Sequence, residues 1–284
     1  MDAPAGAALV RICSRPNDPL LPLSPEPPSQ ALAYRGRNQS LLPIAHPQSQ
    51  PLDELLGIER QKKELIANTR HFVAGRPANH ALLTGSRGTG KSSLVKAMLS
   101  EFGGAGLRLV EVPAHDLTDL PDIVAPLRER AERFVLYVDD FSVQANDPAL
   151  AALKAALDGG VEEPPDNVLI YATSNRRHLM PEFRHENDEF RFKDGELHPG
   201  ESSEEKIALS ERFGLWLSFP PFNQDQFLDA VQMHLRRLAC EVWNEDAEKA
   251  ALRWALGRAS RSGRVAMQFA RDFAARMADR PASE

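Results

Sequence analysis

The chain has 284 residues, 42% of them hydrophobic and 26% charged, which is typical of a globular protein with one large domain and a smaller one. Its net charge of −6 excludes an overall basic field that would recruit nucleic acid or an anionic membrane surface. Its two cysteines exclude a disulfide framework, and no apolar run is long enough for a membrane span or a signal peptide, so we expect a cytoplasmic protein.

The first 51 residues are rich in Pro, Ser and Gln, with four prolines between residues 22 and 28. Such a composition resists both helix and sheet. We therefore expect a Pro-rich N-terminal arm over residues 1–51, which is either flexible or docked on a neighbouring subunit.

Residues 52–221 alternate between helical and strand patterns. An amphipathic helix is predicted over residues 58–74, and a short apolar run ends at Thr84. Four further apolar runs follow, and helices are predicted between strands over residues 91–102, 116–132 and 148–157. The runs occupy residues 107–112, 134–138, 168–172 and 215–219. Nearly continuous apolar strands alternating with helices predict an α/β fold with a doubly wound parallel five-stranded sheet.

After Pro220-Pro221 the strand pattern stops. Three amphipathic helices are predicted over residues 223–241, 244–259 and 262–278, with Asn223, Asn244 and Ser262 as N-caps. We expect a small C-terminal helical lid over residues 222–284.

One glycine-rich motif carries the strongest functional signal. It reads G-x-x-x-x-G-K-[ST] and lies between a strand and a helix. Its residues are Gly85, Ser86, Arg87, Gly88, Thr89, Gly90, Lys91 and Ser92. Backbone N–H groups of such a loop surround phosphates, a helix N-terminus faces the same point, Lys91 meets the β- and γ-phosphates, and Ser92 holds Mg²⁺. The motif predicts a nucleoside triphosphate site.

Polar residues follow two of the later strands. Asp139 is expected to hold the Mg²⁺ environment, and Asp140 to act as the base that orients the attacking water. Asn175 ends another strand, where a neutral amide can contact the γ-phosphate or the water. Arg212 is suited to neutralise charge on a transferring phosphoryl group, and Arg264 to fold back over the nucleotide.

This ordered set of motifs resembles the AAA+ ATPase superfamily over roughly residues 52–278. The resemblance implies that Gly85 to Ser92 is Walker A, with Ser93 next to it, and that Asp139-Asp140 stands at Walker B. It further implies sensor 1 at Asn175, an arginine finger at Arg212, sensor 2 at Arg264, and an adenine-cupping segment at Gly57-Ile58. The strings around Asn175 and Arg212 are similar to a bacterial family of lone AAA+ modules catalogued as domain of unknown function 815.

Two features depart from the usual AAA+ pattern. Asp140 stands where most members have Glu, and the shorter side chain would set the base further back and slow hydrolysis. Residues 186–205 lengthen the distance to Arg212 and carry eight acidic and two basic residues. This segment is either a solvated loop or an excursion that meets a partner or another subunit.

The predicted function is Mg²⁺-dependent binding and hydrolysis of ATP, in a homo-oligomer that forms on ATP binding so that Arg212 acts between subunits. Two alternatives stay open, namely an ATP-gated interaction switch with little hydrolysis and a nucleic-acid-associated ATPase of initiator or loader type. The second is motivated by Arg176-Arg177 but not favoured, given the acidic composition. An unidentified protein client and no membrane partner are expected.

Overall fold

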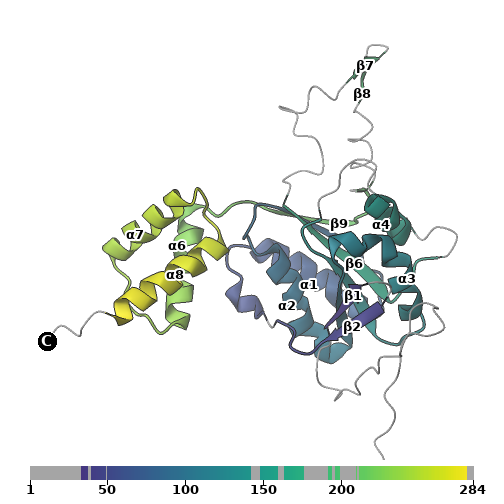
Figure 1. The fold of residues 1–284 in the computed structure, drawn as a ribbon, viewed down its shortest axis with the longest axis horizontal. Coiled ribbons are helices and arrows are strands. Elements are labelled where there is room, and N and C mark those ends of the chain that lie inside the picture. Colours follow the sequence, from purple (N-terminus) through teal and green to yellow (C-terminus); the bar gives the residue numbers. More distant parts are fainter. Residues whose placement is uncertain are drawn as a thin grey trace, which may run out of the picture.

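The computed structural model describes residues 33–37, 40–48, 50–141, 148–158, 163–175, 191–193, 196–198, 209 and 211–279. A twisted sheet with helices on both faces forms the larger part of the molecule, and three C-terminal helices stand beside it (Figure 1). Among the described residues, no helix is both long and apolar enough to cross a bilayer.

The main sheet has seven strands in the order β2-β1-β4-β5-β6-β3-β9. The strands are β1 (Ala33–Arg37), β2 (Ser40–Ile44), β3 (Ala81–Gly85), β4 (Leu107–Glu111), β5 (Arg133–Val138), β6 (Val168–Ser174) and β9 (Leu215–Phe219). All neighbours run parallel except the β1–β2 pair. The five strands predicted from the apolar runs are all confirmed.

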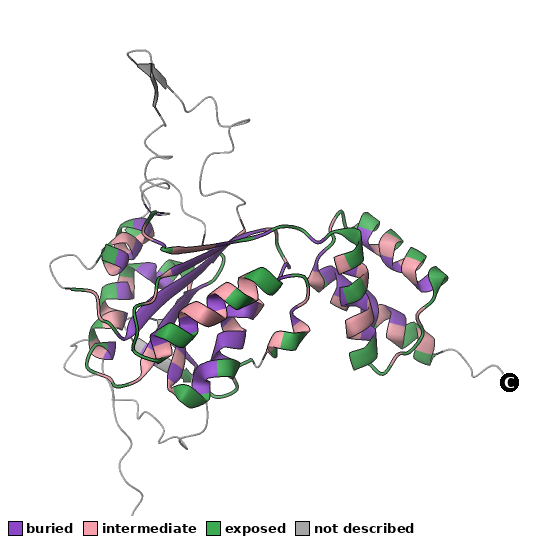
Figure 2. Cartoon of the chain, turned by 180° about the vertical axis from the view of Figure 1, so that it is seen from behind, coloured by how far each residue is buried: buried purple, intermediate pink, exposed green. Residues whose placement is uncertain are grey.

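Helices cover both faces of the sheet, which explains the continuous apolar strands (Figure 2). Along β5, Phe134 and Leu136 belong to one hydrophobic cluster, and Val135 and Tyr137 to the opposite one. On the first face lie α3 (Leu120–Val124) and α4 (Pro148–Asp158). On the second lie α1 (Glu59–Val73) and α2 (Lys91–Phe102).

The N-terminal segment departs from the expectation that it resists helix and sheet. Residues 33–44 form β1 and β2, and β1 pairs in parallel with β4, so the sheet has two strands beyond the predicted five. Tyr34 and Leu41 are buried in the core. The four prolines between residues 22 and 28 lie outside the described residues, and Pro43 is tolerated because β2 is an edge strand.

The single helix predicted over residues 116–132 is also corrected. The chain there forms a 3-10 helix over Ala114–Asp119, then α3, then a 3-10 turn over Ala125–Leu127. Pro121 stands in the first turn of α3, where proline is tolerated. Pro126 has no backbone N–H to continue the hydrogen bonds of the α-helix, which ends at Val124.

Three C-terminal helices, here called the lid, form a third hydrophobic cluster. They are α6 (Gln224–Arg237), α7 (Glu245–Gly257) and α8 (Gly263–Ala278). Asn223, Asn244 and Ser262 each accept a backbone N–H bond at the helix start, so the predicted N-caps are confirmed. The domain boundaries at residues 51 and 221 stay predictions.

Most of the acidic segment over residues 186–205 lies outside the described residues, as do Arg176 and Arg177. Within it the structure describes one antiparallel pair, β7 (Arg191–Lys193) with β8 (Glu196–His198).

Candidate nucleotide-binding site

The parallel register brings the predicted site residues to one edge of the sheet. Thr84 of β3 is opposite Ser174 of β6, and Val138 of β5 is opposite Ala172 of β6. The residues that follow these three strands therefore emerge side by side at their carboxyl ends, where ligands of open α/β sheets bind.

Two glycines of the loop stand where no other residue fits. Gly85 has φ 133°, and a Cβ built on it would lie 2.1 Å from the carbonyl oxygen of Phe219. Gly88 has φ 75°, and its Cβ would lie 2.8 Å from Oγ of Ser262. The loop thus runs tightly between β9 and the first residues of α8, so the lid contacts it directly.

Lys91 begins α2 and is 5% exposed. Its Nζ donates to the carbonyl oxygens of Gly85 and Ser86 at 2.8 and 2.7 Å and to Oδ1 of Asn175 at 3.1 Å. Burial lowers the pKa of Lys91 to about 8, although the charges of Asp140 and Asp139 act to raise it. An anion in the loop would stabilise the ammonium form.

Asp139 directly follows β5 and receives several hydrogen bonds on one oxygen. Ser92 Oγ lies 2.8 Å and Thr173 Oγ1 lies 2.7 Å from Asp139 Oδ1, and the N–H of Asp140 donates to the same atom at 3.1 Å. Burial alone would raise the pKa of Asp139, but the hydrogen bonds from Thr173 and Ser92 help to outweigh it, and the pKa is lowered. The carboxylate is charged at neutral pH.

Asp140 contacts Asn175 across the strand ends. The side-chain amide of Asn175 donates to Oδ1 of Asp140, and its oxygen accepts from Lys91. Lys91 of the loop, Asn175 after β6 and Asp140 after β5 thus form one hydrogen-bonded chain.

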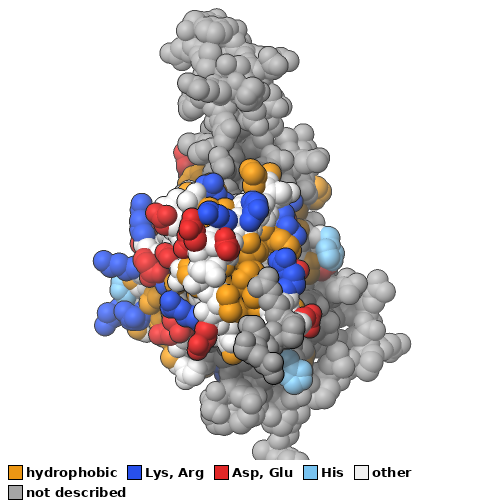
Figure 3. Space-filling view, turned by 90° about the vertical axis from the view of Figure 1, so that its left-hand side faces the viewer, with side chains coloured by type: hydrophobic (Ala, Val, Ile, Leu, Met, Phe, Trp, Pro, Cys, Tyr) orange, Lys and Arg blue, Asp and Glu red, His pale blue; other side chains and the backbone are white. Residues whose placement is uncertain are grey.

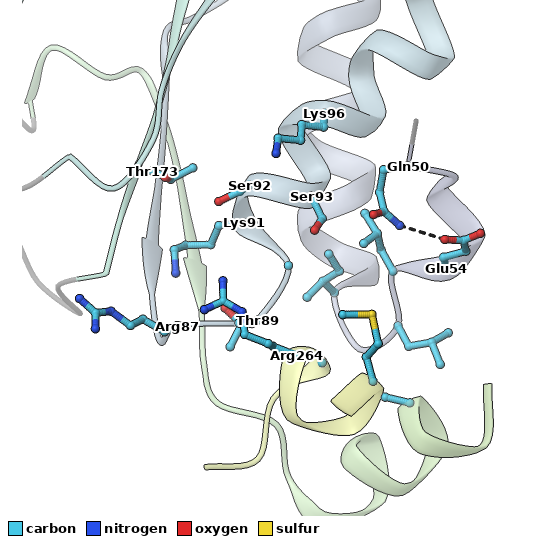
Figure 4. A pocket seen from close by; sticks show the side chains of 18 of the residues that line it. Gln50, Glu54, Arg87, Thr89, Lys91, Ser92, Ser93, Lys96, Thr173 and Arg264 are labelled. Atoms are coloured by element: carbon cyan, nitrogen blue, oxygen red, sulfur yellow. Dashed lines mark hydrogen bonds between the residues drawn. The ribbon is translucent and has the colours of Figure 1, made fainter. Parts of the chain in front are cut away.

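These residues line a cavity of about 710 Å³ between the loop, the segment before α1 and the lid (Figure 4). Its lining includes Arg87, Gly88, Thr89, Gly90, Lys91, Ser92, Ser93, Asp139, Asp140, Thr173, Asn175 and Arg264. A cavity of this size accommodates a nucleotide.

Part of the cavity lining is apolar. Ile58 and Leu56 line it from the segment before α1, and Met233 and Met267 from the lid. Arg264 reaches from the start of α8 toward the loop (Figure 4).

Four predicted residues do not line the cavity. Gly85 and Ser86 form the base of the loop and present carbonyl oxygens to Lys91. Gly57 lies just behind, with φ 73° and its carbonyl oxygen 3.5 Å from Nε2 of Gln226 in the lid. Arg212 forms an ion pair with Asp158 at the end of α4, with 2.6 Å between Nε and Oδ2.

Sequence reasoning missed some residues of the site. Thr173 stands two residues before Asn175, but the sequence predicted a role only for Asn175. Gln48, Gln50 and Lys96 also line the cavity, and Lys96 Nζ donates to Gln48 Oε1 at 3.1 Å. No local pattern marked them, because Gln48 and Lys96 meet only in the folded chain.

The donor set beside the loop fits Mg²⁺. Ser92 and Asp139 offer a hydroxyl and a charged carboxylate, the oxygen ligands this hard cation prefers. Among the described residues, no group of three or more His, Cys, Asp or Glu forms another metal site. Ser92 and Asp139 would supply two ligands to a cation here, which would take the others from nucleotide phosphates and water.

Comparison with known proteins agrees with this architecture. Residues 28–277 match the family described as "Protein of unknown function (DUF815)". A Nocardioides Holliday junction branch migration complex subunit RuvB is 35% identical over 108 residues, which are 38% of this chain and 29% of the relative. The chain thus spans less than a third of that protein.

Solved structures share the fold at low identity. The Thermotoga maritima RuvB Holliday junction branch migration motor superposes with a TM-score of 0.54 at 19% identity, over 81% of this chain and 66% of that one. The Aeropyrum pernix ORC1 protein, solved in complex with DNA, gives 0.57 at 15% identity, over 78% and 61%. The chain belongs to the DUF815 family and has the AAA+ ATPase fold of RuvB.

Proposed function

We propose that this protein binds Mg·ATP in the cavity beneath the lid and hydrolyses it. The observation that carries the proposal is the hydrogen-bonded chain from Lys91 through Asn175 to Asp140, beside the Ser92–Asp139 pair. Groups that bind phosphate, hold a cation and accept a proton thus lie within one cavity of nucleotide size.

Each residue has a separate task in this proposal. The loop amides and Lys91 bind the phosphates, while Ile58 and the lid methionines enclose the base. Ser92 and Asp139 hold Mg²⁺, which would neutralise phosphate charge when bound. Asp140 accepts a proton from the attacking water, and Asn175 keeps that carboxylate oriented.

Completion of the site requires a second subunit in this proposal. Arg212 is 31% exposed and does not line the cavity of its own chain. A partly exposed arginine outside its own site, here paired with Asp158, is suited to act on a neighbouring chain when that pair opens. Leu238, Val242 and Leu256, the large hydrophobic residues exposed in the described part of the chain, all belong to the lid, which supports packing between subunits.

Binding of ATP with and without Mg²⁺, measured by calorimetry on wild type and Lys91→Ala, tests the proposal. Wild type is expected to bind in the micromolar range, and Lys91→Ala at least about a hundredfold more weakly, because the buried ammonium is the main positive charge for the phosphates. Lys249→Ala is the matched control, since Lys249 pairs with Glu245 on the lid surface. Unchanged affinity of Lys91→Ala would rule out this site.

An ATP-gated switch with little hydrolysis is the second candidate. Its support is Asp140, which is one methylene shorter than the usual Glu and is already hydrogen-bonded by Asn175. Single-turnover measurement with labelled ATP separates the two functions. Product formed no faster than in free solution would favour the switch.

Association with nucleic acid is the third candidate, supported by the RuvB branch migration motor and the DNA-bound ORC1 among the similar structures. The lid end of the molecule carries Lys and Arg interspersed with Asp and Glu rather than a uniform basic field (Figure 3). A protein client in the cytoplasm therefore remains our first choice of partner. Salt-dependent DNA binding would reverse that order.

A further inference from the structure

The Thr173 hydroxyl bridges the carboxylate of Asp139 and the backbone N–H of Asp140. Thr173 is the next-to-last residue of β6 and is 1% exposed. Its hydroxyl oxygen lies 2.7 Å from Oδ1 of Asp139 and 3.0 Å from the backbone nitrogen of Asp140. One side chain thus touches both acidic residues that the proposed chemistry uses.

The chemistry of these partners fixes the direction of both hydrogen bonds. A carboxylate can only accept, so the single hydroxyl proton of Thr173 goes to Asp139. The backbone N–H of Asp140 can only donate, so the hydroxyl oxygen of Thr173 accepts that hydrogen bond. Valine has nearly the same shape and can make neither bond.

Thr173 also holds the backbone of Asp140 from a second side. Asp140 has φ 51°, a left-handed conformation that residues with a Cβ rarely adopt. The carbonyl oxygen of Thr173 accepts from the N–H of Phe141 at 2.7 Å, so bonds to Thr173 bracket the residue with the unfavourable backbone. This conformation turns Asp140 toward Asn175.

Ser92 completes the arrangement from the other side of Asp139. Its hydroxyl donates to the same Oδ1 at 2.8 Å, so donors from α2 and β6 hold the carboxylate between them. Loss of the β6 donor would leave Oδ1 of Asp139 with the bonds from Ser92 and the N–H of Asp140, so the orientation of the carboxylate would be less tightly fixed.

We infer that Thr173 is a positioning residue that aims the Asp139 carboxylate at the cation and fixes the backbone that presents Asp140. The inference rests on the proposed function, because it assigns a task within the Mg·ATP site. Thr173 itself touches neither substrate nor reacting atoms in this assignment.

The test measures the ratio of ATP affinities with Mg²⁺ and with EDTA, together with the turnover number. Thr173→Val is expected to lower the ratio about tenfold, the effect of losing one hydrogen bond to a charged group. Affinity in EDTA should stay within about twofold, since the loop is untouched, and turnover should fall about tenfold or more. Thr173→Ser should restore the ratio to within about threefold of wild type.

Thr84→Val is the matched control. Thr84 lies on the adjacent strand β3, is also 1% exposed, and accepts a hydrogen bond from Nε1 of Trp216 at 3.0 Å without contacting either carboxylate. It should keep the wild-type ratio. Thermal melting of each variant shows whether it folds, and Thr173→Ala replaces Thr173→Val if the valine variant does not.

Three results would overturn the inference. The first is an affinity ratio in Thr173→Val, or in Thr173→Ala, equal to that of wild type. The second is a ratio in Thr173→Ser as low as that in Thr173→Val. The third is a ratio in Thr84→Val as low as that in Thr173→Val. Wild-type protein that binds ATP equally with and without Mg²⁺ would instead overturn the proposed function before any variant is compared.

Discussion

The side-chain amide of Asn175 donates a hydrogen bond to the carboxylate of Asp140, across the gap between the ends of β6 and β5. Because the other end of the same amide accepts from Lys91, a change at Lys91 can reach the proposed base through one residue. The distance along the chain between Lys91 and Asn175 is 84 residues, so this contact exists only in the folded sheet.

Replacement of Asp140 by Asn should separate binding from hydrolysis. The new side chain can still accept the bond from Asn175, so the site should keep its shape, but it cannot take a proton from water. We expect turnover to fall about 10²- to 10⁴-fold while the dissociation constant of Mg·ATP stays within about threefold. Steady-state phosphate release and calorimetry give the two values. A variant that still turns over at half the wild-type rate would remove Asp140 from the role of base.

Replacement of Arg212 by Ala tests whether the arginine acts between subunits. An arginine that stabilises phosphoryl transfer is worth about 10³-fold or more in turnover, whereas ATP affinity should change little because Arg212 does not line the cavity of its own chain. The matched control is Arg276→Ala, whose guanidinium pairs with Asp272 on the lid surface.

Mixing makes that test sharper. In our proposal, Lys91→Ala subunits cannot bind the nucleotide but keep Arg212. Arg212→Ala subunits bind the nucleotide but lack the arginine. If the arginine acts in trans, mixed assemblies should regain turnover that neither variant has alone, and turnover per subunit should rise with protein concentration. Activity equal to the sum of the separate variants would contradict the trans arrangement.

Stability should fall on mild acidification because of His80. Burial lowers the pKa of His80 to about 4, and its Nδ1 accepts the N–H of Ile170 at 3.0 Å, which requires the neutral ring. The folded-state pKa lies below the ordinary value of 6.5, so the unfolded chain binds more protons as pH falls from about 6.5 toward 4. Between pH 7 and pH 5 this residue should cost about 2 kcal/mol of unfolding free energy.

The variant His80→Asn isolates this effect, since its amide oxygen can accept the same N–H but does not titrate. Urea unfolding at the two pH values should show a loss about 2 kcal/mol smaller than in wild type. Burial also lowers the pKa of His234 to about 4. His234 therefore contributes equally to the pH dependence of stability in wild type and in His80→Asn. An unchanged pH dependence in His80→Asn would show that His80 is not the titrating group.

The sequence predicted most of the sheet and the phosphate loop because both are encoded locally. An apolar run such as Phe134 to Val138 can only be covered on both faces, and a loop with Gly85 and Gly88 before a lysine suits few other structures. The caps at Asn223 and Ser262 were readable for the same reason, since each bonds an N–H three residues away.

Other features depended on distant parts of the chain. The strands over residues 33–44 were missed because β2 pairs only with β1, and β1 joins the sheet through β4, which begins 63 residues beyond Ile44, counting from residue 44 to residue 107. The Pro-, Ser- and Gln-rich composition of the first 51 residues predicted an arm without regular structure instead.

The sequence by itself determined that this chain builds a parallel α/β sheet with a tight glycine-rich loop and three appended C-terminal helices, because periodicity, glycines and caps act over a few residues. Only the tertiary structure decided that Thr173 bonds both the Asp139 carboxylate and the backbone N–H of Asp140, that Asn175 joins Lys91 to Asp140, and that Arg212 lies away from its own cavity. These relationships depend on strand order and register, which are fixed by packing between segments far apart in the sequence.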